Sequence, residues 1–243
     1  MVGSIASLLA GATTGIGALP IFFTRKVSDT FLDASLGFAV GVMLAATSFG
    51  LLVPAIEIGG IWRTVVGFLL GSVFFIIAEK FTPHQHQVVG VKGPPTQLSK
   101  LWLFILAVTI HNFPEGLAVG VSFGSGDLKE GMIIATGIGL QNIPEGLAVA
   151  LPLLRNNYSK PKAFLIALGT GLVEPIGGLL GVAVISVGKF LLPYGLAFAA
   201  GAMLFVISEE IVPETHSRGN DREATIGLIC GFTLMMILDS LVG

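Results

Sequence analysis

Two similar runs, HNFPEGLAVGVSF and QNIPEGLAVALPL, begin thirty residues apart and carry the side chains best suited to chemistry. His111 and Glu115 stand four residues apart, so on a helix they share one face, and Gln141 and Glu145 repeat that spacing. An imidazole nitrogen beside a carboxylate oxygen suits Zn²⁺ and neighbouring first-row divalent ions. The pattern therefore predicts a binding site for a divalent cation.

The composition identifies the solvent around these runs. Of 243 residues, 53% are hydrophobic and 12% are charged, whereas soluble domains average about 25% charged residues. The mean hydropathy is +0.89. The single cysteine, Cys230, excludes an internal disulfide framework. We therefore expect an integral membrane protein with the lipid bilayer as its surroundings and no nucleic-acid partner.

Continuous apolar runs without alternation predict an all-α membrane protein rather than a barrel. We expect one transmembrane domain over residues 1–243, an eight-helix bundle in a 3+2+3 arrangement, with a longer cytoplasmic loop at 82–100. The expected spans are 2–24, 34–57, 61–81, 101–123, 130–154, 162–188, 190–214 and 224–242.

The basic residues predict the orientation. Ten of the thirteen Lys and Arg residues fall on one side if the spans alternate, and that side is cytoplasmic by the positive-inside rule. Both termini are then expected outside.

Three glutamates fall near the middle of consecutive spans: Glu115, Glu145 and Glu174. Each acidic residue at that depth costs roughly 2.5–3.5 kcal/mol on insertion scales. No lysine or arginine lies mid-span to offset this cost, so the positive charge must come from protons or a bound cation. Pro114 and Pro144 lack an N–H and free a helical carbonyl each, as does Pro175, which we expect to open the helices around a polar cavity.

Inverted repeats turn this binding hypothesis into a transport hypothesis. The fourth and fifth spans run in opposite directions and carry the two similar runs. FAVGVMLAATSFGLLVP in the second span likewise resembles FAAGAMLFVISEEIVP in the seventh. Inverted repeats around a midplane site are typical of secondary transporters.

HNFPEG, QNIPEG and the Glu-Pro of LVEPIGG resemble the ZIP (Zrt/Irt-like) metal transporters, in particular their bacterial GufA-like branch, over essentially the whole chain. The resemblance implies zinc transport into the cytoplasm, with Fe²⁺, Mn²⁺ or Cd²⁺ as further cargo, across a bacterial inner (plasma) membrane. It also implies a homodimer, in which helices one, four, five and six move against a scaffold of helices two, three, seven and eight in an elevator-like alternating-access cycle.

By the same resemblance the chain would hold two metal sites. The first would comprise Met43, His111, Glu115, Gln141 and Glu145. The second would comprise Asn112, Asn142 and Glu174, with Glu115 and Glu145 as bridges. Met43 suits a packing role equally well. Many family members have histidine in place of Gln141, and close bacterial relatives have aspartate in place of Asn142, so the second site here carries one charge fewer.

Other polar residues are candidates for the ion's entrance and exit. The candidates are Glu57 and Asp239 on the outer side, and Glu209, Glu210, His216 and the loop residues His84 and His86 on the cytoplasmic side.

Two other classes compete with a metal transporter. An intramembrane metal-dependent hydrolase would explain histidine and carboxylate on helices, but the chain has no His-Glu-x-x-His motif and an enzyme needs no inverted repeat. A proton-linked carrier of an organic substrate would use the glutamates but leaves His111 and the amides unexplained. We therefore expect a transporter and not an enzyme.

Overall fold

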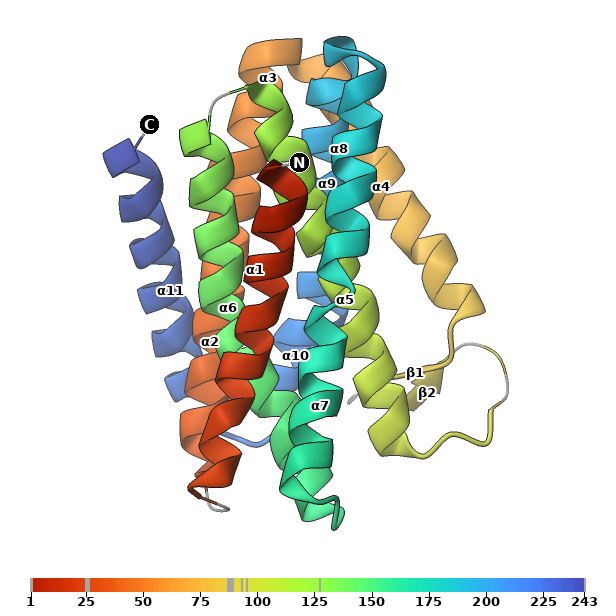
Figure 1. Ribbon diagram of the computed structural model, residues 1–243, viewed down its shortest axis with the longest axis vertical. Coiled ribbons are helices and arrows are strands. Elements are labelled where there is room, and N and C mark those ends of the chain that lie inside the picture. Colours follow the sequence, from red (N-terminus) through yellow and green to blue (C-terminus); the bar gives the residue numbers. More distant parts are fainter. Residues whose placement is uncertain are drawn as a thin grey trace.

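Long helices joined by short connections make up almost all of the computed structural model, which describes residues 2–24, 27–86, 90–92, 94, 96–126 and 128–242 (Figure 1). The helices are α1 (Val2–Ala18), η1 (Leu19–Phe22), α2 (Asp29–Ala45), η2 (Ala46–Leu52), α3 (Val53–Gly59), α4 (Ile61–Phe81), α5 (Lys100–Ser122), η3 (Phe123–Ser125), α6 (Leu128–Arg155), α7 (Lys160–Gly171), α8 (Glu174–Val187), η4 (Lys189–Leu191), α9 (Leu192–Val206), η5 (Ile207–Ile211), α10 (Val212–Thr215) and α11 (Asp221–Val242).

One element departs from the expected all-α fold. Strands β1 (His84–His86) and β2 (Gly90–Lys92) form an antiparallel pair within the 82–100 loop, with His84 opposite Lys92. Each strand has only three residues, too few to show the alternation by which a strand is recognised in a sequence.

Seven helical segments in the described part of the chain are long and apolar enough to cross a membrane. They are Val2–Phe22, Asp29–Gly59, Ile61–Phe81, Lys100–Ser122, Lys160–Val187, Lys189–Thr215 and Asp221–Leu241. The chain is thus a multi-pass membrane protein. The remaining expected span, 130–154, corresponds to α6, which has 28 residues but lower hydropathy because it carries Gln141, Asn142 and Glu145.

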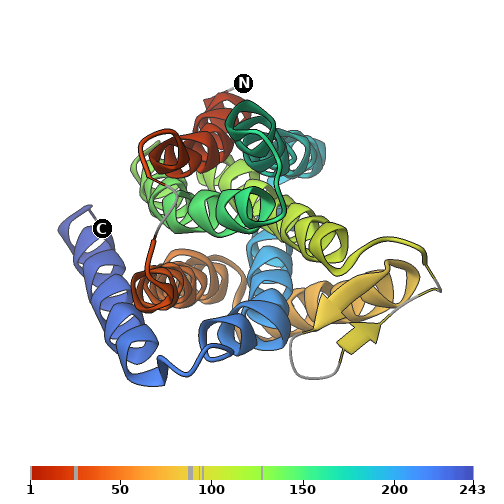
Figure 2. The same ribbon diagram turned by 90° about the horizontal axis from the view of Figure 1, so that it is seen from below.

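The long helices form two groups, which Figure 2 shows side by side. In the first group α1 packs on α6, α7 and α8, and α5 packs on α8; in the second, α2 packs on α11 and α4 on α9. The two groups meet where α2 packs on α6 and α5 on α9. The first group contains the helices that the resemblance assigns to the moving unit, and the second those that it assigns to the scaffold.

Glycine allows the closest of these contacts. A Cβ on Gly116 of α5 would collide with the carbonyl oxygen of Glu174 at the start of α8. Small residues let helices approach in lipid, where no hydrophobic force drives them together. The position of the Glu174 backbone therefore depends on the absence of a side chain at Gly116.

Gly116→Ala is expected to lower the free energy of unfolding by about 1–3 kcal/mol, as overpacking does. Gly169 is the matched control, because it is exposed on α7 and a Cβ there meets nothing within 4 Å. Gly169→Ala should leave stability unchanged or raise it slightly. Thermal unfolding in detergent measures both, and an equal effect of the two substitutions would contradict the packing argument.

Two π-helices were not expected from the sequence. η2 and η5 directly precede the Val-Pro pairs at Pro54 and Pro213, in the two segments that resemble each other. In Figure 1, α2 rises towards α3 while α9 descends towards α10, so the two segments run in opposite directions. A π-turn often marks a functional site, and η5 carries Glu209 and Glu210.

The prolines open one helix rather than three. α5 and α6 continue through Pro114 and Pro144, whereas the chain is non-helical between Gly171 and Glu174, just before Pro175. α5 and α6 thus remain helical although Pro114 and Pro144 cannot donate an N–H to the carbonyls of Ile110 and Leu140. The expectation of open helices at Pro114 and Pro144 is therefore wrong.

Candidate functional site

All eight side chains predicted to bind metal are buried. Those of His111 and Glu145 are 5% and 6% exposed, and the other six are fully buried. The set, here called the buried polar cluster, consists of Met43 on α2, His111, Asn112 and Glu115 on α5, Gln141, Asn142 and Glu145 on α6, and Glu174 at the first residue of α8.

Hydrogen bonds connect three helices within the buried polar cluster. Gln141 Nε2 donates to Glu115 Oε1 at 2.8 Å, which joins α6 to α5. Asn142 Nδ2 donates to Glu174 Oε1 at 2.6 Å, which joins α6 to α8. Asn142 Nδ2 also lies 2.9 Å from the carbonyl oxygen of Ala10 on α1. Residues of both repeats and the Glu-Pro of α8 thus lie together in the structure.

Most polar atoms of the cluster remain without a hydrogen-bond partner. Of the eleven buried side-chain polar atoms that lack one in the described part of the chain, nine belong to the cluster. They are His111 Nε2, both amide atoms of Asn112, Glu115 Oε2, Gln141 Oε1, Asn142 Oδ1, both carboxylate oxygens of Glu145, and Glu174 Oε2. Buried polar atoms are nearly always paired in proteins, so such a concentration suits a site that meets a cation.

The cluster is not arranged as a finished metal centre. Among the described residues, no three His, Cys, Asp or Glu side chains are grouped so that they could hold an ion. The amide groups of Gln141 and Asn142 instead approach Glu115 and Glu174 with their N–H groups. Rotation of either amide about its terminal bond would exchange the N–H group for the unpartnered oxygen, which can bind a cation.

A cavity lies beside the cluster, and acidic side chains line it. His111, Glu145, Glu209, Glu210 and Glu214 contribute its polar lining. His111 Nε2 lies 2.5 Å from Glu210 Oε2, an ion-pair distance without the geometry of a hydrogen bond. The structure therefore connects the cluster to Glu209 and Glu210, two of the predicted exit residues.

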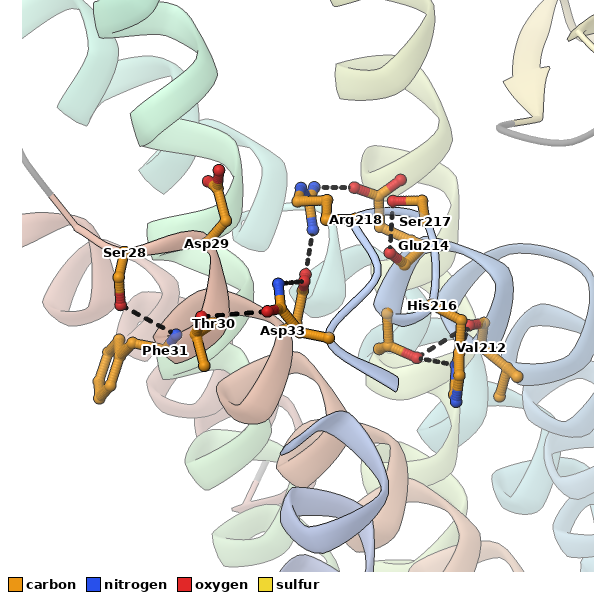
Figure 3. Close-up of polar contacts among 12 residues, drawn as sticks. Ser28, Asp29, Thr30, Phe31, Asp33, Val212, Glu214, His216, Ser217 and Arg218 are labelled. Carbon is orange, nitrogen blue, oxygen red and sulfur yellow. Dashed lines mark hydrogen bonds and ion pairs between the residues drawn. The ribbon is translucent and has the colours of Figure 1, made fainter. Parts of the chain in front are cut away.

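Glu214 is a lining residue that the sequence analysis missed. Arg218 Nη2 donates to Glu214 Oε1, and Arg218 Nη1 donates to Asp33 Oδ1 on α2 (Figure 3). Asn220 Nδ2 donates to the other oxygen of Asp33 at 2.8 Å. The i, i+4 spacing of Glu214 and Arg218 was a signal for their pairing, but nothing in the sequence indicated Asp33.

Arg218 stays charged beside the cavity. Burial alone would lower the pKa of its guanidinium, but the ion pairs with Glu214 and Asp33 outweigh burial and raise the pKa above its usual value. A permanent positive charge therefore holds Glu214 at the edge of the acidic lining.

The remaining predicted residues lie apart from the cavity lining. Glu57 is exposed on α3 and Asp239 is half-buried on α11. His216 is exposed, and its Nδ1 lies 2.8 Å from Thr215 Oγ1 and 3.0 Å from the Val212 carbonyl oxygen (Figure 3). His84 and His86 lie on β1, and their side chains are outside the described residues.

Comparison with known proteins adds independent evidence. A family model described as "ZIP Zinc transporter" matches residues 95–239. "Zinc transporter GufA" of Myxococcus xanthus is 46% identical to this chain over 99% of each sequence. "Zinc transporter ZIPB" of Bordetella bronchiseptica is 42% identical over 96% of this chain and 78% of its own. "Zinc transporter ZIP11" of Homo sapiens is 33% identical over 93% of each.

Proposed function

Since the chain belongs to the ZIP family, and is therefore a transporter of divalent metal cations rather than an enzyme, we propose that it carries Zn²⁺ into the cytoplasm through the buried polar cluster. The observation that carries the proposal is the set of nine unpartnered polar atoms on seven histidine, glutamate and amide side chains of α5, α6 and α8. Fe²⁺, Mn²⁺ and Cd²⁺ are proposed as further cargo.

The proposed topology has eight spans, with α6 as the span that hydropathy alone does not identify. Gln141, Asn142 and Glu145 are all buried, so the polar residues of α6 face the bundle and leave its outer surface for lipid. The π-helices at matching places in α2–α3 and α9–α10 support an inverted repeat. Both termini lie outside in this topology, and the protein forms a homodimer in a bacterial inner membrane.

We assign the cluster to two cation sites. His111, Glu115, Gln141, Glu145 and Met43 form the first site, in which imidazole and thioether suit Zn²⁺. Asn112, Asn142 and Glu174 form the second, with Glu115 and Glu145 shared as bridges. Gln141 and Asn142 donate to Glu115 and Glu174 without an ion, and each turns its oxygen inward when the ion arrives.

The cavity supplies the way out towards the cytoplasm. An ion bound by His111 and Glu145 would pass to Glu210, which already contacts His111, and then to Glu209 and Glu214. The α1–α5–α6–α8 group moves against the α2–α4–α9–α11 group to expose the cluster to each side in turn, in an elevator-like cycle. The cavity, with a volume of about 50 Å³, has room for a few waters or an ion.

Zinc influx into proteoliposomes that contain a fluorescent indicator tests the proposal. The purified chain should produce zinc influx above that of protein-free liposomes. Cd²⁺, Mn²⁺ or Fe²⁺ added outside should slow this zinc influx if these ions are also cargo. Influx no faster than in protein-free liposomes would refute zinc transport.

Asn142→Asp is expected to lower stability without metal and to increase stabilisation by Zn²⁺. The substitution removes the donor that Glu174 and Ala10 accept from and places a second carboxylate against Glu174. Unfolding temperatures with a chelator and with excess Zn²⁺ measure both effects. Asn142→Leu is the control, since it removes the same donor but adds no charge. In this variant Zn²⁺ should raise the unfolding temperature no more than it does in wild type. If Zn²⁺ raises the unfolding temperature of Asn142→Asp no more than that of wild type, the assignment of Asn142 to the second site is refuted.

A further inference from the structure

The hydroxyl of Thr14 on α1 is fully buried and has no hydrogen-bond partner. A helical threonine usually donates to the carbonyl three or four residues before it. For Thr14 the carbonyl four residues back is that of Ala10, which already accepts from Thr13 Oγ1 at 2.6 Å and from Asn142 Nδ2 at 2.9 Å. The Thr14 hydroxyl thus has no partner, while the carbonyl of Ala10 accepts from Asn142, a residue of the buried polar cluster.

The same face of α1 contacts the residues assigned to the second site. Ala10 and Thr14 are one helical turn apart, and Asn142 donates to both the Ala10 carbonyl and Glu174. A Cβ on Gly11 would lie 3.3 Å from the Glu174 Cβ. A Cβ on Gly171 would collide with Thr14 Oγ1, so this hydroxyl lies directly against the interruption between α7 and α8.

We propose that the Thr14 hydroxyl is a further ligand of the second cation site, an inference that rests on the two-site function proposed above. Its partners would be the carboxylate of Glu174 and the amide oxygens of Asn112 and Asn142. All of these ligands are oxygens, whereas the first site includes imidazole and thioether. Oxygen ligands suit harder cations such as Mn²⁺, and softer ligands suit Zn²⁺ and Cd²⁺. Relative to the first site, the second site therefore favours harder divalent cations, and Zn²⁺ binds at both.

A purely structural role for Thr14 leads to a different result. Valine has nearly the shape of threonine but no hydroxyl, so Thr14→Val removes a buried unpaired group without opening a cavity. If the hydroxyl only fills space, this substitution should raise the unfolding temperature of the metal-free protein and leave its response to metal unchanged. If the hydroxyl binds a cation, the response to Mn²⁺ must weaken.

The experiment follows the unfolding temperature of the full-length protein in detergent, after chelation, as Mn²⁺ is added. Thr14→Val should need about tenfold more Mn²⁺ than wild type for half of the maximal rise, as for the loss of one interaction at a metal site. Thr14→Ser keeps the hydroxyl and should respond as wild type does. The Cd²⁺ response, which the imidazole and thioether of the first site dominate, should be nearly the same in all three proteins.

Thr13→Val is the matched control, because its hydroxyl is hydrogen-bonded to Ala10 and Gly139. This substitution should lower the unfolding temperature without changing the Mn²⁺ midpoint. If Thr14→Val fails to fold, Thr14→Ala deletes the same hydroxyl and takes its place in the comparison.

A Thr14→Val protein with the wild-type Mn²⁺ midpoint would overturn the assignment, and so would a wild-type protein that does not respond to Mn²⁺. Both results are independent of transport. Wild-type zinc influx together with an unchanged Thr14→Val midpoint would refute only the Thr14 ligand, whereas a weakened midpoint in a protein without zinc influx would refute only the transport proposal.

Discussion

Replacing His111 or Glu145 by alanine is expected to abolish most zinc uptake, with a loss of at least about 10–100-fold, the range for disturbed metal sites. Both side chains belong to the buried polar cluster and also line the cavity, so each is positioned to meet the ion at the start of its exit path. Both oxygens of Glu145 lack a partner, and His111 contacts Glu210. His111 is the one imidazole of the buried polar cluster, and Glu145 is one of the two carboxylates assigned to both sites.

Initial rates of zinc influx into proteoliposomes, with equal amounts of each protein, measure this loss. Glu223→Ala is the control for removal of a glutamate, because Glu223 is exposed on α11, outside the cavity lining. Gel filtration and unfolding temperature establish that each variant is folded. Influx by a folded Glu145→Ala protein at the wild-type rate would exclude Glu145 from the ion's path.

Arg218→Gln is expected to cost about 3–5 kcal/mol of stability, because it leaves buried carboxylates without their positive partner. Asp33 is fully buried and Glu214 is 8% exposed, and Arg218 donates to both. The Arg218–Asp33 ion pair also connects α2 to the segment between α10 and α11. Its loss should therefore loosen the side of the cavity that Glu214 lines. Adding Asp33→Asn to Arg218→Gln should restore part of the stability, because it removes the unpaired charge.

Unfolding in detergent measures the single and double variants against a second ion pair of the same chain. Arg155 Nη2 donates to Asp29 Oδ1 at 2.8 Å, but both side chains are about half exposed, at 51% and 50%. Arg155→Gln should therefore cost about 0–1 kcal/mol. Similar losses in Arg218→Gln and Arg155→Gln would show that burial of Asp33 does not determine the effect.

The sequence by itself determined the class of the protein, the limits of most helices and the residue types of the cluster. The expected span 61–81 coincides with α4 (Ile61–Phe81), because a membrane demands a continuous apolar run whose ends are visible locally. The depth of Glu115, Glu145 and Glu174 followed from counting along those spans. All three side chains are buried in the structure, as acidic residues within membrane-spanning segments usually are.

Only the tertiary structure decided which helices meet at that depth and at its edges. Thr14 lies 128 residues before Asn142 in sequence, and its missing acceptor became evident only where α1 packs on α6. The contact of His111 with Glu210, and that of Arg218 with Asp33, likewise join residues far apart in sequence. The π-helices, and the helices that continue through Pro114 and Pro144, were likewise evident only in the structure. The contacts between distant segments arise from tertiary packing, and no local pattern of residue types encodes them.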